Sequence, residues 1–347
     1  MRRLLSIFFF ASFLLSHRFA GAQNADNPGA YMTAISNAQS EMNQKYMAYM
    51  SAAAHERRAR KVEKLRLQVL ESITNSRYKT IEVSHYKGDN TLRQSSLDYI
   101  KLCYNVFNED YNRIVNMEEI AEQSFDAMQA FILLQEKTAE KIQEATEKMT
   151  KAEKDFAAKY NVTLVEGNDE LSRKLEVSGK LNRYRDQVFL IFFKCNWQDG
   201  ELTKAINAKK VNDAEQARNS LIRYADEGLQ ALEKLEPFNG DPALAIGCRQ
   251  VLRFYKEIAE KDVPKIIEFI LKEEAFTKMK KTFEAQPAAR RTQQDVDAFN
   301  KSVNEINAQA KTFNKLNDDI NKGRNKMLQM WENADKAFAD KHMPYYK

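Results

Sequence analysis

The sequence predicts an all-α protein, an elongated helical bundle with coiled-coil-like long helices and two related halves. Only 10 Gly and 6 Pro occur in 347 residues, against average usage of about 7% and 5%. The long stretches between them are rich in Ala, Glu, Lys, Gln, Leu and Met, which are strong helix formers. The best strand candidate, VFLIFF at 188–193, lies inside a breaker-free pattern over 180–199, which favours a buried helix.

Helices are expected wherever the chain lacks breakers and carries helix-terminus signals. Asn212 or Asp213 can cap one helix, Asp241 with Pro242 can begin another, and Pro264 kinks or restarts the chain. Gly200 could interrupt a helix. The expected helices cover 31–76, 90–115, 117–160, 169–209, 212–236, 241–263, 264–285 and 292–342.

Two of these helices carry apolar residues in alternating steps of four and three, the 3.5-residue period of coiled-coil packing. One set runs from Met128 to Phe156 and the other from Phe299 to Phe338. Asn317 and Arg324 interrupt the second seam. A seam Asn can fix register or partner. We favour a simpler interpretation, in which Arg324 snorkels to solvent and Asn317 faces a local gap.

The N-terminus has the three-part layout of a secretory signal peptide. Arg2 and Arg3 precede the apolar run LLSIFFFASFLL, and Ala20 and Ala22 satisfy the small-x-small rule for cleavage after Ala22. The alternative is an uncleaved anchor, but a dozen apolar residues are too few for a span of roughly 20. No Cys follows the run, so the sequence does not support a lipoprotein anchor. We therefore expect residues 1–22 to be removed.

The charge of the mature chain is nearly balanced. Removing residues 1–22 takes away three arginines and no acid, so the net charge falls from +5 to +2. Such a chain has no global attraction to nucleic acid, and we expect no nucleic-acid partner. No remaining apolar segment is long enough for a transmembrane span, which also argues against a helical pore.

Two turns suggest an internal duplication. The turn at 86–89, which ends in Gly88-Asp89, recurs at an offset of 152 as the turn at 238–241, which ends in Gly240-Asp241. Near the ends, KDFAAK at 154–159 matches KAFADK at 336–341 at an offset of 182. The second half therefore carries about 30 extra residues. Amphipathic helices always resemble one another, but the shared turn and ending favour duplication. We assign the halves to 23–165 and 166–347.

Motifs for chemistry are scarce, and we expect no catalytic residue, cofactor or metal. A helical di-iron site needs two Glu-x-x-His motifs and two further Glu, but only Glu82 and His85 form one. No nucleophile elbow, phosphate loop or zinc-protease motif is present. The paired acids at 109–110 and 118–119 are typical of a solvated helix face.

The cysteines and the basic segment at 55–66 each allow two interpretations. Cys103, Cys195 and Cys248 lie in apolar stretches, which favours three buried thiols. Export would also permit a Cys103–Cys248 disulfide. The segment HERRARKVEKLR has six Lys or Arg and two Glu. It could bind anionic headgroups or acidic polysaccharide, but its glutamates favour a solvated helix face.

Several stretches of the chain resemble a known family. They are ARKVEKLRLQVLESI at 59–73, YNVFNEDYNRIVNMEEIAEQSFDAM at 104–128, VFLIFFK at 188–194 and FADKHMP at 338–344. This chain resembles uncharacterised, signal-peptide-bearing helical surface proteins of Bacteroidetes and spirochaetes. The resemblance covers nearly the whole mature chain. It implies an extracytoplasmic location, in the periplasm or at the surface of a Gram-negative-type bacterium, and it brings no activity or ligand.

The sequence thus favours an exported, non-enzymatic scaffold that contacts an unknown protein or envelope component. Exposed seam residues would support that function. The alternative is a soluble extracytoplasmic carrier that holds an apolar small molecule between helices near Phe189, Phe192 and Phe193. A closed core at these residues would argue against the carrier.

Overall fold

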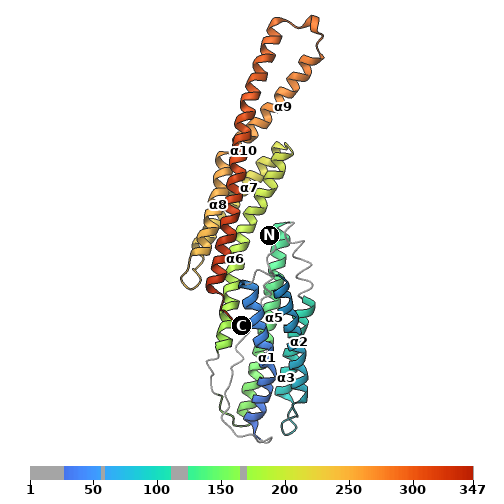
Figure 1. Cartoon of the computed structure of the whole chain (residues 1–347), viewed down its shortest axis with the longest axis vertical. Helices are drawn as coiled ribbons and strands as arrows, with labels where there is room; N and C mark the ends of the chain where they lie inside the picture. The colour runs from blue at the N-terminus through green and yellow to red at the C-terminus, as the bar shows by residue number, and fades with distance from the viewer. Residues whose placement is uncertain (1–26, 56–58, 111–123, 165–169, 347) are drawn as a thin grey trace. The chain divides into compact units, whose positions relative to one another are not determined.

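The computed structural model describes residues 27–55, 59–110, 124–164 and 170–346, and every regular element in these ranges is a helix (Figure 1). The all-α prediction is therefore confirmed. The predicted cleavage site at Ala20 and Ala22 lies outside the described residues. The helices are α1 (Pro28–His55), α2 (Ala59–Glu82), α3 (Thr91–Asn105), the π-helical η1 (Val106–Asp110), α5 (Phe125–Lys159), α6 (Glu170–Asn207), α7 (Val211–Lys234), α8 (Ala243–Lys261), α9 (Val263–Ala285), the 3-10 turn η2 (Ala288–Arg290) and α10 (Gln293–His342).

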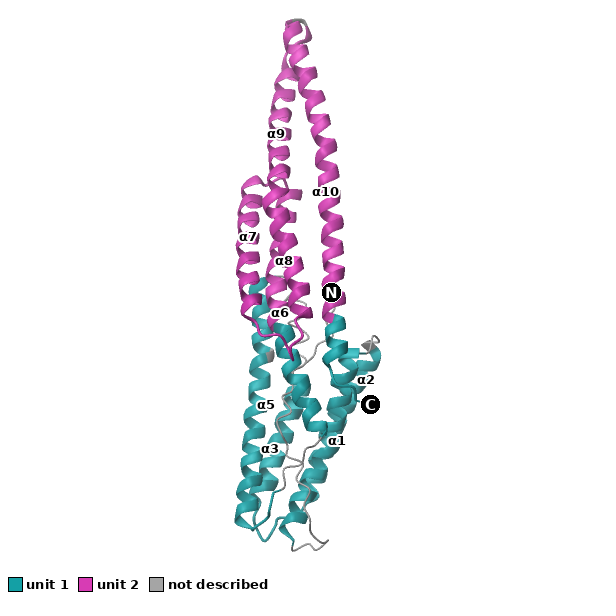
Figure 2. Cartoon of the chain, turned by 90° about the vertical axis from the view of Figure 1, so that its left-hand side faces the viewer, with its two compact units in different colours: residues 1–186, 336–347 teal, residues 187–335 magenta. Residues whose placement is uncertain are grey.

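The chain divides into two compact units (Figure 2). Unit 1 comprises residues 1–186 and 336–347, and unit 2 comprises residues 187–335. Both divisions fall inside helices, α6 and α10, so each of these helices contributes residues to both units. The boundary between the predicted halves, at 165/166, lies instead between α5 and α6.

The first expected helix, 31–76, is wrong as a single element. The structure has two helices there, α1 and α2, which lie side by side in unit 1. The Lys79 ammonium of α2 contacts the Glu41 carboxylate of α1 at 2.9 Å. Because α1 continues to His55 and α2 then returns beside it, a continuous helix is ruled out. Neither Gly nor Pro marks this reversal, and so the composition did not reveal it.

The helix-terminus signals gave mixed results. Pro264 lies in the first turn of α9, as expected. α7 begins at Val211 without a side-chain cap, so the expected capping by Asn212 or Asp213 is wrong. α6 continues through Gly200 without a break, because a helix held by packing tolerates one glycine.

Aromatic rings form the core at the end of unit 1 where α1 begins and α5 ends. Tyr31, Tyr86 and Phe156 are all buried. The ring of Tyr31 lies 5.5 Å from that of Tyr86 and 5.2 Å from that of Phe156. Tyr160 packs edge-on against Tyr86 at 4.9 Å. Such contacts add to the hydrophobic free energy of burying the rings, and they join α1, α5 and the turn between α2 and α3.

The core of unit 2 combines stacked rings with close helix contacts. Phe192 of α6, in the VFLIFF segment, stacks on Trp331 of α10 at 4.5 Å. The helical assignment of that segment is confirmed. At Gly228 of α7, a Cβ atom would lie 2.5 Å from Leu252 and 2.9 Å from Ile191. A larger residue would therefore separate α7 from its neighbours.

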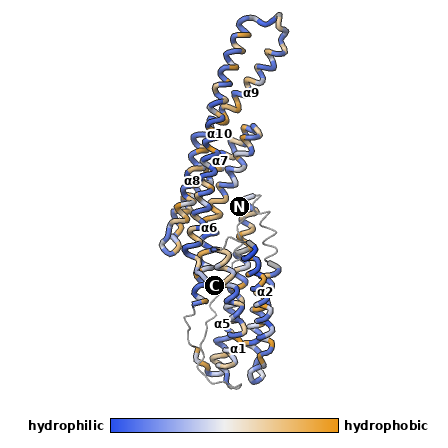
Figure 3. Tube along the Cα trace, viewed as in Figure 1, coloured by the Kyte–Doolittle hydropathy of each residue, from blue (hydrophilic) through white to orange (hydrophobic). Residues whose placement is uncertain are grey.

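Apolar and polar residues alternate along every described helix (Figure 3). Across the described ranges, no helix combines the length and the apolar character that crossing a membrane requires. The apolar side chains instead pack between helices, as in a bundle.

Candidate functional site

The two predicted repeat turns have the same local geometry. In each, the aromatic residue and the aspartate form a backbone bridge, Tyr86 with Asp89 and Phe238 with Asp241. Gly88 has φ +82° and Gly240 has φ +76°, values that L side chains rarely adopt. Asp89 Oδ1 accepts from the Thr91 amide, and Asp241 Oδ1 accepts from the Ala243 amide, both at 2.9 Å. This geometry is compatible with duplication, which stays a prediction.

The Asp89 carboxylate also binds the end of α5. It accepts hydrogen bonds from the Lys159 ammonium at 2.7 Å and from the Tyr160 hydroxyl at 3.1 Å. The Lys159 contact, together with the Thr91 amide, holds the pKa of Asp89 well below its ordinary value of 3.8. Asp89 thus ties the turn between α2 and α3 to α5.

We expect Asp89→Ala to lower the free energy of unfolding by about 1–2 kcal/mol, because the hydrogen bond from the Thr91 amide and the contacts with Lys159 and Tyr160 are lost. Asp89→Asn should cost less, since asparagine also caps helices. A depressed carboxyl pKa stabilises the fold above the unfolded value of 3.8 and loses that effect as the pH falls. The gap between wild type and Asp89→Ala in urea titrations should therefore shrink in acid. A pH-independent gap would contradict the role of the carboxylate.

His55 holds the segment that follows α10 against the end of α1. Its Nδ1 lies 3.1 Å from Asp340 Oδ1, and its Nε2 lies 3.1 Å from the Met343 carbonyl oxygen. Its ring stacks on Tyr345 at 3.8 Å. Both oxygens are acceptors, so only a ring protonated on both nitrogens donates to both. These contacts tie the end of α1 to the end of α10 and the residues that follow it.

The basic segment around α2 is less continuous than its sequence implies. Arg66 is largely buried and donates to the Glu63 carboxylate at 2.8 Å. Arg60, Lys61 and Lys64 are exposed, whereas 56–58 lie outside the described residues. The solvated-face interpretation thus fits Arg60, Lys61 and Lys64 but fails for Arg66.

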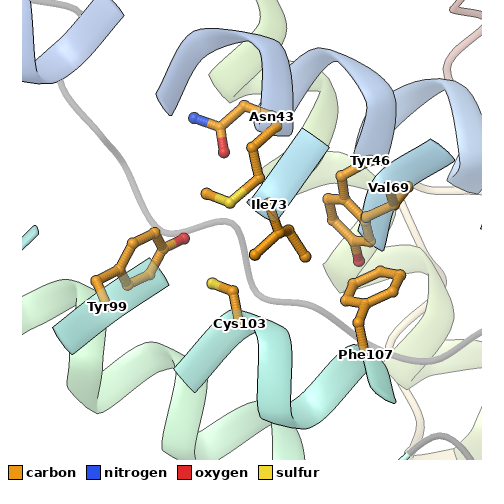
Figure 4. Close-up of a pocket in the computed structure, with 8 residues that line it drawn as sticks. Asn43, Tyr46, Val69, Ile73, Tyr99, Cys103 and Phe107 are labelled. Atoms are coloured by element: carbon orange, nitrogen blue, oxygen red, sulfur yellow. The ribbon is translucent and has the colours of Figure 1, made fainter. Parts of the chain in front are cut away.

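A small cavity lies between α1, α2, α3 and η1 in unit 1 (Figure 4). The Tyr99 hydroxyl and the Cys103 thiol face it, and Met42, Ile73 and Phe107 close its apolar side. Its volume of about 20 Å³ suffices for about one water molecule. Burial raises the pKa of the Cys103 thiol to about 12, so that thiol is a poor nucleophile. The cavity therefore offers no room for a substrate.

All three cysteines are free and buried, so the Cys103–Cys248 disulfide is absent and the buried-thiol interpretation holds. Burial also raises the pKa of Cys195 to about 12. Within the described ranges, no group of three or more His, Cys, Asp or Glu side chains could hold a metal ion. His85 is exposed near the Arg93 guanidinium, at 3.4 Å.

Unit 2 contains a buried ion pair between α6 and α10. Arg324 Nε and Nη2 donate to the two Asp199 carboxylate oxygens at 2.8 and 2.7 Å, and the side chains are only 13% and 8% exposed. The expectation that Arg324 snorkels to solvent is therefore wrong. Burial raises the pKa of Asp199, and the charge and hydrogen bonds of Arg324 oppose that shift. Nearby in unit 2, the Tyr255 hydroxyl donates to Asn196 Oδ1 at 2.8 Å.

The extended part of unit 2 is a helical hairpin formed by α9 and the first half of α10, which run side by side beyond the ends of α7 and α8 (Figures 1 and 2). Between residues 271 and 319, no side chain that the structure describes is buried. Phe283 stacks on Phe299 at 4.2 Å, and Phe269 stacks on Phe313 at 4.4 Å. The Arg291 guanidinium lies over Phe283 at 4.5 Å, near the tip. Paired rings therefore hold two otherwise solvated helices together.

The comparisons with known proteins do not assign the chain to a family. No family model, no curated protein and no solved structure matches the chain. The α9–α10 hairpin is the candidate functional element, because it is the long exposed part of unit 2. The sequence predicted the apolar seam of α10. It did not distinguish the exposed part of that seam, in the hairpin, from the part that is buried at the end of α10.

Proposed function

We propose that the chain is an exported, non-enzymatic helical protein of the cell envelope or cell surface, which acts as a scaffold for an unknown protein or envelope component. The observation that carries this proposal is the α9–α10 hairpin. α9 has 23 residues and α10 has 50, and at 1.5 Å per residue α10 is about 75 Å long. Neither α7 nor α8 extends along its distal part (Figure 1).

The seam of the hairpin supports a contact function. On α10, Ile320 and Trp331 are buried, whereas Phe299, Ile306 and Phe313 are only half-buried. The same 3.5-residue pattern is thus covered by a bundle at one end and by a single helix at the other. Partly covered apolar rows on a long helix pair are a common binding mode for partner helices.

The charges on the hairpin favour a protein partner over a polyanion. Exposed lysines and glutamates alternate and pair along α9, as in Lys272–Glu268 at 2.6 Å and Lys278–Glu274 at 2.7 Å. A surface with both signs of charge has little attraction for nucleic acid or acidic polysaccharide. It suits a partner whose own surface carries both signs of charge.

The hairpin also coincides with the extra stretch of the second half. Met279 matches Met128 at an offset of 151, and Trp331 matches Met149 at an offset of 182, so the additional 30 or so residues fall between Met279 and Trp331. If the halves arose by duplication, the second copy gained length chiefly where α9 and α10 extend beyond the other helices. Such an insertion adds surface without adding core, which supports a role in contact.

The carrier alternative gains no support from the phenylalanines of α6. Phe189, Phe192 and Phe193 are 7%, 0% and 7% exposed. Phe189 packs on Phe193 at 5.7 Å, and Phe192 stacks on Trp331. Their rings contact one another and the core, as structural residues do. We therefore retain the scaffold as the proposed function.

Site-specific photo-crosslinking in cells tests this proposal. A photoreactive amino acid at Lys281 or Asn300, both exposed on the hairpin, should give adducts of a defined mass. The matched control positions are Lys234 on α7 and Glu260 on α8, which are also exposed but lie outside the hairpin. Adducts from all four positions, or from none on the hairpin, would contradict a hairpin-specific partner.

Export has its own test. N-terminal sequencing of the protein from the cell envelope should begin at Gln23. A protein that begins at Met1 and stays in the cytoplasmic fraction would contradict the proposed location and leave the hairpin result to be judged separately.

A further inference from the structure

The turn between α7 and α8 contains an asparagine that is followed directly by a glycine. Asn239-Gly240 is the only such pair in the sequence. Both residues are exposed, and their φ angles are +50° and +76°. Apart from the adjoining residues, nothing lies within 4 Å of the position that a Cβ atom on Gly240 would occupy. The backbone around this pair is therefore uncrowded.

Such a pair can react with itself. The backbone nitrogen of the glycine attacks Cγ of the asparagine, and a new N–Cγ bond closes a five-membered succinimide ring. The Cγ–Nδ2 bond breaks, and Nδ2 leaves as ammonia with the proton of the attacking amide. Water then opens the ring at either carbonyl and gives aspartate or its isomer isoaspartate. Glycine favours the attack because it has no side chain to crowd the nitrogen.

We propose that Asn239 is a site of spontaneous deamidation, with the backbone nitrogen of Gly240 as the nucleophile and water as the second reactant. The hydrogen bond that must break first is a long one: the Gly240 amide donates to the Pro237 carbonyl oxygen at 3.2 Å, the upper end of the usual range. Because the turn is exposed, water reaches the ring as soon as it forms.

A second pair with similar chemistry shows what the structure adds to the sequence. Asp199-Gly200 is the only Asp-Gly pair, and aspartate can form the same ring with loss of water. Both carboxylate oxygens of Asp199 are held by Arg324, at 2.8 and 2.7 Å. Gly200 lies inside α6, where its amide belongs to the helical hydrogen-bond ladder. The fold therefore protects this pair and leaves Asn239 free to react.

Isoaspartate would change the turn, because its backbone runs through the former side chain and is one carbon atom longer. The insertion falls between Phe238 and Asp241, which form a backbone bridge. Asp241 Oδ1 also accepts from the Ala243 amide at 2.9 Å, at the beginning of α8. A longer backbone displaces Asp241 from that amide. We therefore expect isoaspartate at Asn239 to loosen the first turn of α8.

The other repeat turn supplies a matched variant. Lys87 and Gly88 have φ angles of +50° and +82°, close to those of Asn239 and Gly240, but lysine cannot form the ring. Asn239→Lys therefore copies a residue that the same turn geometry already accepts. This inference concerns the turn between α7 and α8, so it stands or falls independently of the function proposed for the hairpin.

Mass spectrometry of the folded protein during incubation in mildly alkaline buffer tests the modification. A protease specific for Lys and Arg releases peptide 235–249, in which Asn239 is the only asparagine. This peptide should gain the mass difference between an amide and an acid, and it should separate into isoaspartate and aspartate forms. Asn161 is the internal control, since it is also exposed with φ +55°. Asn239 should react at least about tenfold faster, because Asn161 is followed by the branched Val162.

Two results would overturn the proposed modification. One is an Asn239 that keeps its amide in the folded protein and loses it only in urea, which would show that the turn protects it. The other is a product that contains aspartate without isoaspartate, which would exclude attack by Gly240. Peptide 195–204, which carries Asp199, should gain isoaspartate in urea but not in the folded protein.

Hydrogen exchange at the Ala243 amide tests the consequence. Exchange should be at least about tenfold faster in the isoaspartate form than in fresh protein, because that amide loses its acceptor. Asn239→Asp keeps the ordinary backbone and should exchange like fresh wild type. Asn239→Lys should keep both its mass and its exchange rate through the same incubation. Equal exchange in the isoaspartate form and in fresh protein would overturn the proposed loosening of α8.

Discussion

Arg324→Met is expected to lower the free energy of unfolding by about 3–5 kcal/mol, because it leaves the Asp199 carboxylate buried without its counter-charge. The two side chains are 13% and 8% exposed and share two hydrogen bonds. The effect should be partly reversible by a second change. In Asp199→Asn/Arg324→Met the buried charge is gone, and most of the lost stability should return.

Urea denaturation followed by circular dichroism measures this effect, using the transition that the substitution moves. Lys322→Met is the matched control on the same helix. Its ammonium contacts Asp318 at 2.6 Å, but both side chains are exposed, at 71% and 60%. An exposed pair contributes at most about 1 kcal/mol. Equal losses for Arg324→Met and Lys322→Met would contradict the structural role of the buried pair.

Much of the fold was predictable because local composition decides it. Scarce Gly and Pro, strong helix formers and Pro264 at the start of α9 act within a few residues. The seam of α10 was predictable for the same reason, since the spacing of its apolar residues can be read directly from the sequence. Both repeat turns were found from the short pattern of aromatic residue, Gly and Asp, which needs a positive φ.

The features that were missed depend on distant residues. The reversal between α1 and α2 has no local breaker and follows from packing within unit 1. Arg324 was noticed as a charge in an apolar seam, yet its partner Asp199 is 125 residues away, and no spacing rule reaches that far. A charged residue in a seam either extends to solvent or forms an ion pair. Which of the two occurs depends on the side chains of the facing helix.

Glu153 is a second buried charge that sequence reasoning overlooked, although a signal was present. It lies four residues after Met149 and three before Phe156, and both of these side chains are buried seam residues of α5. A glutamate at that spacing belongs to the buried face of the helix. In the surrounding run of charges, KAEKDF, it looked like one more solvated residue. The structure leaves it only 7% exposed.

The Glu153 carboxyl is buried without full compensation. Its Oε2 has no hydrogen-bond partner in the part of the chain that the structure describes. Burial raises the pKa of Glu153 from 4.5 to about 7. Ionising Glu153 is therefore less favourable in the folded protein than in the unfolded chain. The folded state keeps the proton between these two pH values, whereas the unfolded state loses it.

Glu153→Gln should therefore stabilise the protein at neutral to alkaline pH. A raised acid pKa favours the fold below pH 4.5 and loses that advantage as the pH rises through about 7. At pH values above 7 the full penalty applies, and removing it should raise the free energy of unfolding by about 3 kcal/mol. In acid the two proteins should be equally stable, because the wild-type carboxyl is then neutral too.

Urea titrations at several pH values test this expectation, with Glu144→Gln on the exposed side of the same helix as the control. The control should change stability by less than about 0.5 kcal/mol at any pH. A Glu153→Gln effect that is the same in acid and in alkali would show that the gain came from packing, not from the carboxyl charge. The sign also separates these two buried acids. The Asp199 carboxylate has the Arg324 guanidinium as its partner, whereas removing the charge of Glu153 should raise stability.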